Sequence, residues 1–274
     1  MLRCCMKDYY SEAPAILQDF LTYHEVIKTH SAKTVDEYFL DLRNFFRYLK
    51  SRRDPSLRGL PMDQISITDI DADFIRKVTL TEVYDYLSYL SRNREINHNS
   101  STSSKKGLMP ASRARKIAAI RSFFKYVTVK AHILEENPVK DLDSPKLKKA
   151  LPRYLTMEES IHLLQAPEGT NQERDYCILT LFLNCGLRVS ELTELRVSNI
   201  YAEQGYISVF GKGRKQRIVP IADSAIQEIK NYFKFRYEID VKHGYEDYVF
   251  LNRFGRKLSR IMVFNIVKRY CQEA

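Results

Sequence analysis

The sequence of 274 residues contains no apolar run of the roughly 18 residues that a membrane-spanning helix requires. Its N-terminus, Met1-Leu2-Arg3-Cys4-Cys5, also lacks the long apolar region of a secretory signal. Neither secretion nor membrane insertion is predicted, and we expect a cytoplasmic protein without a membrane partner.

The five cysteines are too few and too scattered to indicate a disulfide framework or a zinc site. Cys4 and Cys5 are adjacent, whereas Cys177, Cys185 and Cys271 stand far apart. An odd number of cysteines cannot pair completely, and no spacing matches that of metal ligands. We therefore expect free thiols in a reducing compartment and no metal.

Acidic residues are absent from residues 105–130, although that stretch contains eight basic residues. The whole chain has 44 Lys and Arg against 34 Asp and Glu, a net charge of +10. A phosphate-rich partner is the simplest explanation, because a polyanion releases counterions when protein cations replace them. Charge alone does not distinguish this partner from a basic but unpartnered surface. The exposed faces lack interleaved aromatic residues, which argues against single-strand stacking and favours duplex DNA.

Prolines divide the chain into two predicted domains. Pro138, Pro145 and Pro152 lie close together with three lysines between residues 146 and 149, a composition that stops helices and leaves an extended connector. We predict a helical DNA-binding domain over residues 1–137, a linker over 138–153 and a second domain over 154–274.

The first half has the apolar periodicity of helices. One predicted helix has its cap at Ser31 or Thr34 and carries Arg43, Arg47 and Lys50 on a basic face. A second covers residues 81–92, a polar loop follows over 97–106, and Pro110 begins a third helix. The inward-facing residues predicted for these helices are Tyr38, Leu42, Phe45, Phe46 and Leu49; Val83, Tyr84, Leu87 and Leu90; and Ile117, Ile120, Phe124 and Val127.

The second half mixes helices with a small antiparallel sheet. Thr156 and Glu159 have the spacing of a capping box before a helix that runs through Leu164. The fold class is therefore mainly α with a small antiparallel β-sheet. Further predicted helices cover residues 174–184, where Gly186 ends the helix, 224–237, and 259 to the end; predicted strands cover 206–210 and 216–220, with a possible short strand at 248–252.

Arg188 follows an apolar helix and a glycine in the motif Gly186-Leu187-Arg188-Val189-Ser190-Glu191-Leu192. A new helix is predicted from Val189, so that its first N–H groups and the planar guanidinium can converge on an anion. A structural ion pair with Glu191 or Glu194 is the alternative. Both can hold, because Glu191 can orient the arginine while the arginine binds the anion.

Lys212 lies between two glycines in Gly211-Lys212-Gly213-Arg214-Lys215-Gln216-Arg217, at the predicted tip of a hairpin. In that position it can stabilise a developing negative charge or donate a proton to a departing alkoxide. A solvent-facing turn lysine is the alternative. The motif differs from a nucleotide-binding loop, since neither Ser nor Thr follows Lys212, and a nucleotide hydrolase is therefore disfavoured.

The two motifs together closely resemble the tyrosine recombinases, or phage integrase family, with the bacterial Xer type as the nearest match. The resemblance covers nearly the whole chain, including the Asn137-Pro138 linker and Leu155-Thr156 beyond it. It implies an all-helical SAM-like core-binding domain followed by an α+β integrase-type catalytic domain. It also implies a site-specific enzyme that cuts and rejoins double-stranded DNA through a 3′-phosphotyrosyl intermediate, without a cofactor and as a tetramer on paired sites.

The resemblance assigns roles to individual residues. Arg188 is expected to bind the scissile phosphate, Lys212 to protonate the leaving 5′ oxygen, and Glu191 to support the arginine. From the basic faces and this likeness, we predict DNA contacts for Thr34, Arg43, Arg47, Arg113, Arg115, Lys116, Arg121, Lys125, Arg214, Lys215 and Arg217.

The sequence departs from the family pattern near Ala274, because it contains no His-x-x-Arg motif followed by a nucleophilic tyrosine. Tyr270 lies too early, in an apolar helical stretch, and is interpreted as a packing residue. We expect a truncated chain that is inactive alone, with the missing motifs encoded after Ala274. A catalytically inactive DNA-binding protein or regulator is the alternative, and a type IB topoisomerase is a weaker one. Target sequence remains open, as does the choice between chromosome-dimer resolution and mobile-element integration.

Overall fold

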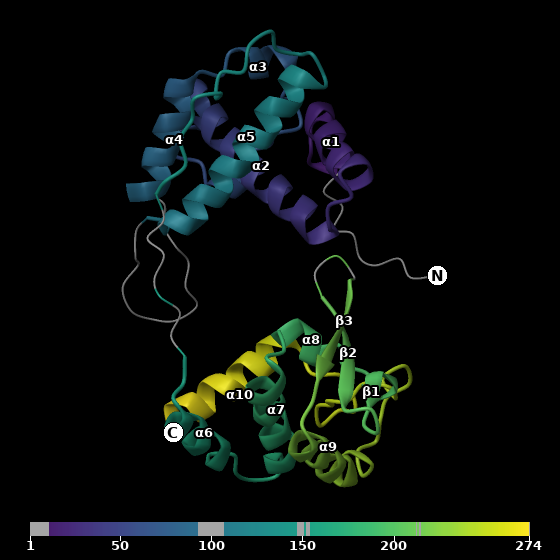
Figure 1. Cartoon of the computed structure of the whole chain (residues 1–274). Coiled ribbons are helices and arrows are strands. Elements are labelled where there is room, and N and C mark those ends of the chain that lie inside the picture. The colour runs from purple at the N-terminus through teal and green to yellow at the C-terminus, as the bar shows by residue number, and fades with distance from the viewer. Residues whose placement is uncertain are drawn as a thin grey trace. The chain divides into compact units, whose positions relative to one another are not determined.

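The computed structural model describes residues 11–92, 107–146, 151, 154–211, 213 and 215–273. The chain forms two compact units, unit 1 (Met1–Ala150) and unit 2 (Leu151–Ala274), which Figure 1 draws with their helices and strands labelled. The predicted loop at 97–106 lies outside the described residues, as do residues 147–150, 152 and 153 of the predicted linker.

Unit 1 is helical in its described residues, and its two longest helices pack against each other. Fully buried phenylalanines from three helices fill the centre, among them Phe20, Phe45 and Phe123. The rings of Phe20 and Phe123 meet edge to face at 5.5 Å, a favourable aromatic geometry. The elements are α1 (Ala15–Thr22), η2 (Tyr23–Ile27), α2 (Ala32–Arg53), η3 (Pro55–Leu57), η4 (Met62–Gln64), α3 (Ala72–Arg76), α4 (Leu80–Arg92) and α5 (Pro110–Val129).

The apolar stripes predicted for α2 and α5 are buried except for Tyr38, which is partly buried, and Pro110 occupies the first turn of α5. Of the two predicted caps of α2, Ser31 is the N-cap, because its hydroxyl accepts a hydrogen bond from the Thr34 amide. The inward face of α4 was predicted with one error. Tyr84 is 50% exposed, whereas Tyr86 is 1% exposed, because Tyr86 shares a face with Val83 at helical spacing.

Unit 2 places a three-stranded antiparallel sheet beside helices. The sheet order is β1 (Ile200–Tyr201), β2 (Tyr206–Phe210), β3 (Gln216–Pro220), and Phe210 pairs with Gln216 next to the connecting turn. The two longer strands match their predicted bounds. Beside them are α6 (Met157–Gln165), α7 (Gln172–Cys185), α8 (Val189–Thr193), η5 (Val197–Asn199), α9 (Asp223–Arg236) and α10 (Arg260–Glu273).

The third strand is not the one predicted. Residues 248–252 make only isolated bridges, Arg196 with Tyr248 and Leu251 with Lys257, while the two-residue β1 completes the sheet. The run Tyr248-Val249-Phe250 is apolar because it is buried, and an apolar run resembles a strand in sequence. Burial alone, however, does not create a ladder of hydrogen bonds.

The predicted helix boundaries of unit 2 are set by local chemistry. Thr156 and Glu159 form the reciprocal capping box at the start of α6, and Gly186 ends α7 in the left-handed conformation. Tyr270 on α10 is 1% exposed, and its hydroxyl donates to Asp175, as expected of a packing residue. The mainly helical fold with a small antiparallel sheet is therefore confirmed.

Candidate active site

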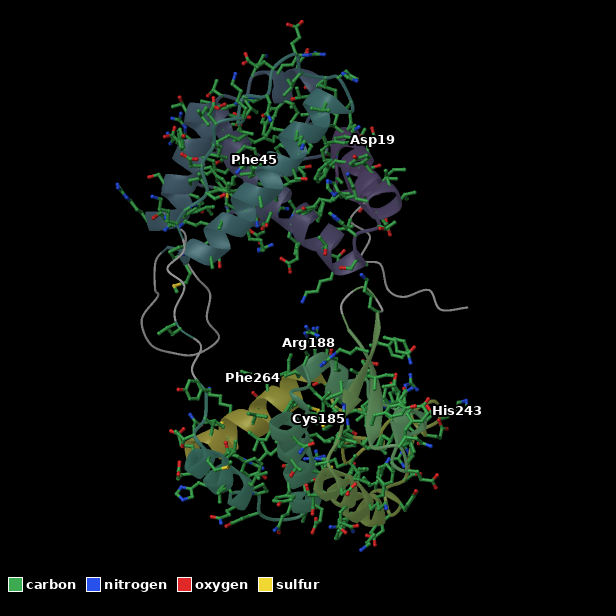
Figure 2. The ribbon with its side chains drawn as sticks, in the orientation of Figure 1. Asp19, Phe45, Cys185, Arg188, His243 and Phe264 are labelled. Atoms are coloured by element: carbon green, nitrogen blue, oxygen red, sulfur yellow. The ribbon has the colours of Figure 1, made fainter. Side chains whose placement is uncertain are left out.

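The position of Arg188 follows from the turn between α7 and α8. Gly186 has φ +56°, which reverses the chain at the end of α7, and Leu187 is then 7% exposed in the core. Arg188 follows as the N-cap of α8, with its side chain 65% exposed. Figure 2 shows its guanidinium projecting outward from the ribbon of unit 2. The buried Leu187 next to the exposed Arg188 fixes the position of the guanidinium on the surface of unit 2.

Glu191 is the buried partner of this arginine. Its side chain is 0% exposed, and it accepts hydrogen bonds from the backbone N and Nη1 of Arg188, both at 2.8 Å. Arg217 of β3 donates to the same carboxylate through Nε at 3.2 Å and Nη2 at 2.8 Å. Four donors occupy the whole acceptor capacity of one carboxylate. The sequence predicted the bond to Arg188 but gave Arg217 only a DNA contact.

The charge state of Glu191 follows from these donors. The hydrogen bond from Arg217 is the largest cause that lowers its pKa, and with the bonds from Arg188 it outweighs the opposing effect of burial, so that the pKa falls to about 2. Glu191 is therefore an anion at neutral pH. Arg188, Arg217 and Glu191 together carry one net positive charge.

At the start of α8, the N–H of the N-cap residue is not available to an anion. The helix has only five residues, and the N–H of Arg188 already donates to Glu191. The guanidinium of Arg188 remains exposed at this position. Nη1 is bonded to Glu191, and no further bond joins the guanidinium to another described residue.

The β2–β3 hairpin lies against the arginine and its carboxylate. A Cβ added at Gly211 would stand 3.6 Å from Glu191 Oε1 and 3.7 Å from Arg188 Nη1, which is van der Waals contact. The Gly211 amide donates to the Lys215 carbonyl at 2.8 Å and closes the base of the turn. Lys212 and Arg214 lie outside the described residues, so their assigned roles remain predictions.

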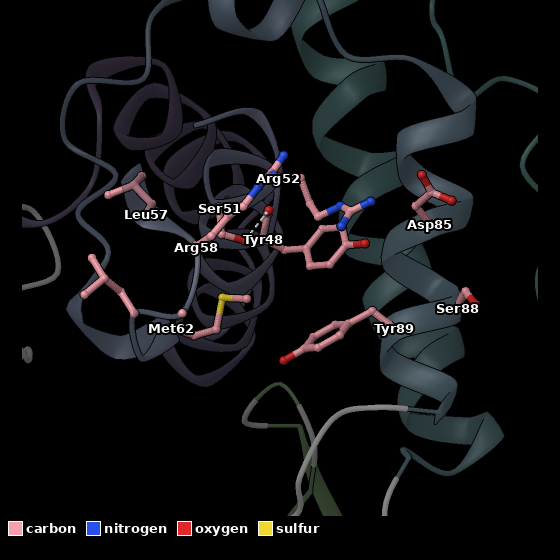
Figure 3. A pocket seen from close by; sticks show the side chains of 11 residues that line it. Tyr48, Ser51, Arg52, Leu57, Arg58, Met62, Asp85, Ser88 and Tyr89 are labelled. Carbon is pink, nitrogen blue, oxygen red and sulfur yellow. Dashed lines mark hydrogen bonds between the residues drawn. The ribbon is translucent and has the colours of Figure 1, made fainter. Parts of the chain in front are cut away.

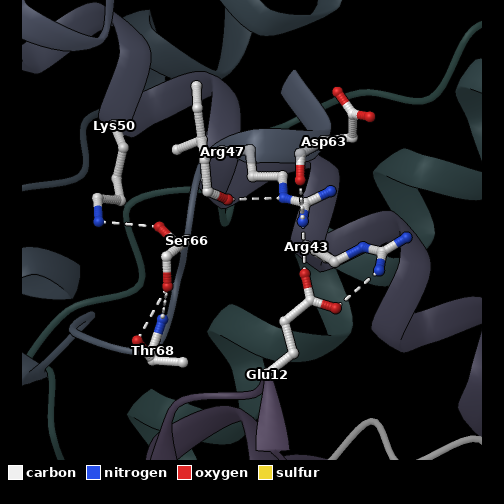
Figure 4. A network of polar contacts seen from close by, with 8 residues as sticks. Glu12, Arg43, Arg47, Lys50, Asp63, Ser66 and Thr68 are labelled. Atoms are coloured by element: carbon white, nitrogen blue, oxygen red, sulfur yellow. Dashed lines mark hydrogen bonds and ion pairs between the residues drawn. The ribbon is translucent and has the colours of Figure 1, made fainter. Parts of the chain in front are cut away.

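Two predicted DNA contacts on α2 hold the fold of unit 1 together. Arg47 is 7% exposed and donates to the carbonyls of Asp63 and Ile65 and to Glu12, which also pairs with Arg43 at 2.8 Å (Figure 4). Basic residues at helical spacing were interpreted as an outward face, but the chain before α1 and the segment that contains η4 cover it. Arg47 is therefore corrected to a structural residue, and Arg43 is partly covered.

Lys116 of α5 requires the same correction. Its side chain is 5% exposed and bonds to Asp41 of α2 at 2.6 Å, where Asp41 is 1% exposed. Arg115 bridges Asp41 and Glu37 but remains 46% exposed. Lys116 sits next to Ile117 on the buried side of α5, which sequence charge could not reveal because the partner acid is far away in the chain. The predicted contacts that stay at least partly accessible without a described ion pair are Thr34, Arg113, Arg121, Lys125 and Lys215.

Unit 1 also contains a cavity of about 430 Å³ beside the end of α2 (Figure 3). The rings of Tyr48 and Tyr89 stack in its wall with centroids 5.0 Å apart. Arg52, Arg58 and Asp85 also line it, so its charged groups have both signs.

Across the described residues, no group of three or more His, Cys, Asp or Glu side chains is placed to hold a metal ion. Within the same part of the chain, every helix is too short or too polar to cross a bilayer.

Comparison with known proteins gives consistent matches. The profile of the phage integrase family matches residues 153–274. The chain is 40% identical over 261 residues to tyrosine recombinase XerC of Caldanaerobacter subterraneus subsp. tengcongensis, an alignment that covers 95% of this chain and 69% of that protein.

Solved structures resemble the chain as well. The XerH site-specific recombinase bound to palindromic difH substrate, in a post-cleavage complex, has a TM-score of 0.61 at 20% identity over 94% of this chain and 66% of that one. A λ integrase tetramer bound to a Holliday junction has a TM-score of 0.56 at 18% identity, over 93% and 65%. At these identities the structures establish the fold alone.

Proposed function

From the premise that this chain belongs to the phage integrase family and is a tyrosine-type site-specific DNA recombinase, we propose that Arg188 binds the phosphate at which a DNA strand is cut. The observation that supports this role is an exposed guanidinium held by a buried, ionised Glu191. A planar fork with free donors matches two oxygens of a phosphodiester. Family membership does not favour the alternative of a DNA-binding protein without catalysis.

The chemistry required at this site is charge stabilisation. When a tyrosine attacks the phosphorus, negative charge builds on the non-bridging oxygens, and donors already in place stabilise it without reorganisation. Arg188 supplies such donors. Lys212, which lies between β2 and β3 in the sequence, is proposed to protonate the 5′ oxygen as it leaves. The resulting 3′-phosphotyrosyl bond is later attacked by a 5′ hydroxyl of the partner strand, which rejoins the DNA and releases the tyrosine.

Duplex DNA is the proposed partner of both units. The accessible cations Arg121 and Lys125 on α5 and Lys215 on the hairpin support phosphate contacts in each unit. Because the λ integrase relative is described as a tetramer on a Holliday junction, we propose the same assembly on paired sites. Chromosome-dimer resolution in the cytoplasm is the proposed setting, since the 40% identical relative is a XerC recombinase.

The proposed function predicts a covalent intermediate. The chain, expressed from its gene to the natural stop codon, should form a denaturation-resistant adduct with a nicked suicide duplex that carries its target site. Candidate sites come from selection of bound sequences out of a random duplex library. Protein that binds a selected site tightly and never forms an adduct, with nick positions scanned across the site, would overturn the proposal.

A further inference from the structure

Arg217 shares one buried carboxylate with the proposed phosphate-binding arginine. We propose that Arg217 is a positioning residue: by occupying Glu191, it prevents the carboxylate from capturing the whole guanidinium of Arg188 and leaves that guanidinium free for phosphate. This inference rests on the proposed role of Arg188. It reassigns Arg217, which the sequence predicted as a DNA contact.

The hydrogen bonds divide unequally between the two arginines. Arg217 reaches both carboxylate oxygens, Nε to Oε1 at 3.2 Å and Nη2 to Oε2 at 2.8 Å. The guanidinium of Arg188 reaches only Oε1, through Nη1 at 2.8 Å. Carboxylates prefer a two-bond fork with a guanidinium. Arg217 takes that fork, and Arg188 is left with a single side-chain bond.

Burial makes this division consequential. Because the side chain of Glu191 is 0% exposed, water does not replace a missing donor easily. Without Arg217, the carboxylate would have two unsatisfied acceptor positions directly beside Arg188. Rotation of Arg188 into the vacated fork would satisfy them and withdraw its outer donors from phosphate.

The charge balance points the same way. With both arginines, the cluster carries one net positive charge, which matches the single negative charge of a phosphodiester. With Arg188 alone, Glu191 would cancel the charge that binds the phosphate. Arg217 therefore affects the reacting phosphate through Glu191, although it does not need to touch it.

Arg217 also connects the hairpin to α8. It pairs across the sheet with Val209, which lies near the end of β2, the strand that leads into the turn. Its bonds to Glu191 span 26 residues of sequence and fix the base of the turn to the start of α8. Loss of Arg217 should thus disturb Arg188 and the base of the hairpin together.

A double-mutant experiment separates this role from a DNA contact and from simple stabilisation. Arg217→Ala should lower the single-turnover rate of adduct formation at saturating DNA by about 100-fold, the scale of losing one preorganised donor. Combining it with Glu191→Gln removes the competing charge, so the double variant should recover about tenfold over Arg217→Ala. Arg217→Lys should fall between wild type and Arg217→Ala, because one ammonium reaches one oxygen. Lys230→Ala, an exposed cation on α9, controls for loss of charge.

These four variants, and Glu191→Gln alone, are compared by rate and by affinity for inorganic phosphate, which is followed through the Nε signal of Arg188 by NMR. This readout needs no strand cleavage, so it tests the inference even if wild type forms no adduct, a result that would count against the proposed function instead. Thermal melting identifies variants that fail to fold, for which Arg217→Gln is substituted. The inference would be overturned if the rate loss of the double variant equalled the product of the losses in Arg217→Ala and Glu191→Gln, and if its phosphate affinity were no higher than that of Arg217→Ala. A loss of DNA affinity without a change in rate would assign Arg217 to DNA contact.

Discussion

At the scale of single residues, Arg188 and Arg47 show that the same type of side chain can be exposed to a ligand or buried in the structure. Arg47 is 7% exposed, and its guanidinium donates hydrogen bonds to Glu12 and to two backbone carbonyls. The side chain of Arg188 is 65% exposed and gives the fold one side-chain bond. The difference lies in how many acceptors the surrounding chain offers, and it decides which guanidinium can bind a ligand.

Arg188→Ala should lower the rate of adduct formation by about 100-fold or more, because donors to the developing charge are removed. DNA affinity should fall far less, since most phosphate contacts lie elsewhere. Gel-shift titration and adduct trapping on the same duplex measure the two quantities. Arg188→Lys is the matched control and should retain part of the rate. Equal losses of affinity and rate would mean that Arg188 grips DNA without a role in the chemistry.

Glu191 should make stability depend on pH in the acid range. Its folded pKa of about 2 lies below the ordinary value of 4.5, so the carboxylate stabilises the fold above pH 4.5 and loses this contribution as pH falls towards 2. Glu191→Gln cannot titrate. The difference in the free energy of unfolding between wild type and Glu191→Gln should therefore shrink from pH 5 to pH 2 in urea titrations. A constant difference would contradict the ionised, arginine-bound state of Glu191.

At the scale of elements, the turn between α7 and α8 depends on the left-handed conformation of Gly186. Gly186→Ala should destabilise unit 2 by about 1 kcal/mol, because a side chain disfavours positive φ, although no atom lies within 4 Å of the added Cβ. Gly186→Asn is the control, since asparagine tolerates this region better than alanine. Chemical denaturation measures both. If alanine and asparagine were equally tolerated, the turn would not need the left-handed conformation.

The packing of α2 on α5 includes the buried pair of Asp41 and Lys116. Lys116→Ala leaves Asp41 without this partner in the core and should cost about 3 kcal/mol of stability. Arg121→Ala, on the exposed side of the same helix, should change stability by no more than about 0.5 kcal/mol. Urea unfolding of both variants compares a buried with a solvated cation. A mild effect of Lys116→Ala would restore that residue as a candidate DNA contact.

At the scale of the whole molecule, the net charge of +10 acts through the cations that remain accessible. Affinity for duplex DNA should fall linearly as the logarithm of salt concentration rises, because bound phosphates release counterions. Arg121→Ala and Lys125→Ala should each reduce that slope by about one. Fluorescence anisotropy at several salt concentrations measures the slope. Wild-type slopes in both variants would remove α5 from the DNA-binding surface.

Much of the architecture was predictable because its signals are local. The strands at 206–210 and 216–220, the capping box of α6 and the glycine that ends α7 depend on residues within a few positions of one another. One error concerns a feature that has a local signal, since Tyr86, unlike Tyr84, shares a helical face with Val83. The other concerns residues 248–252, which are buried without forming a strand because their pairing depends on distant segments.

Motif order was enough to assign the family and to single out Arg188 with Glu191, since an arginine and an acid three positions apart meet on any helix. The partners of the other cations came from contacts across the fold. Lys116 meets Asp41 over 75 residues and Arg217 meets Glu191 over 26. Whether a cation is buried or free depends on which acid the packing brings to it. Periodicity and charge counts do not show which acidic residue packs against a given cation in the folded chain.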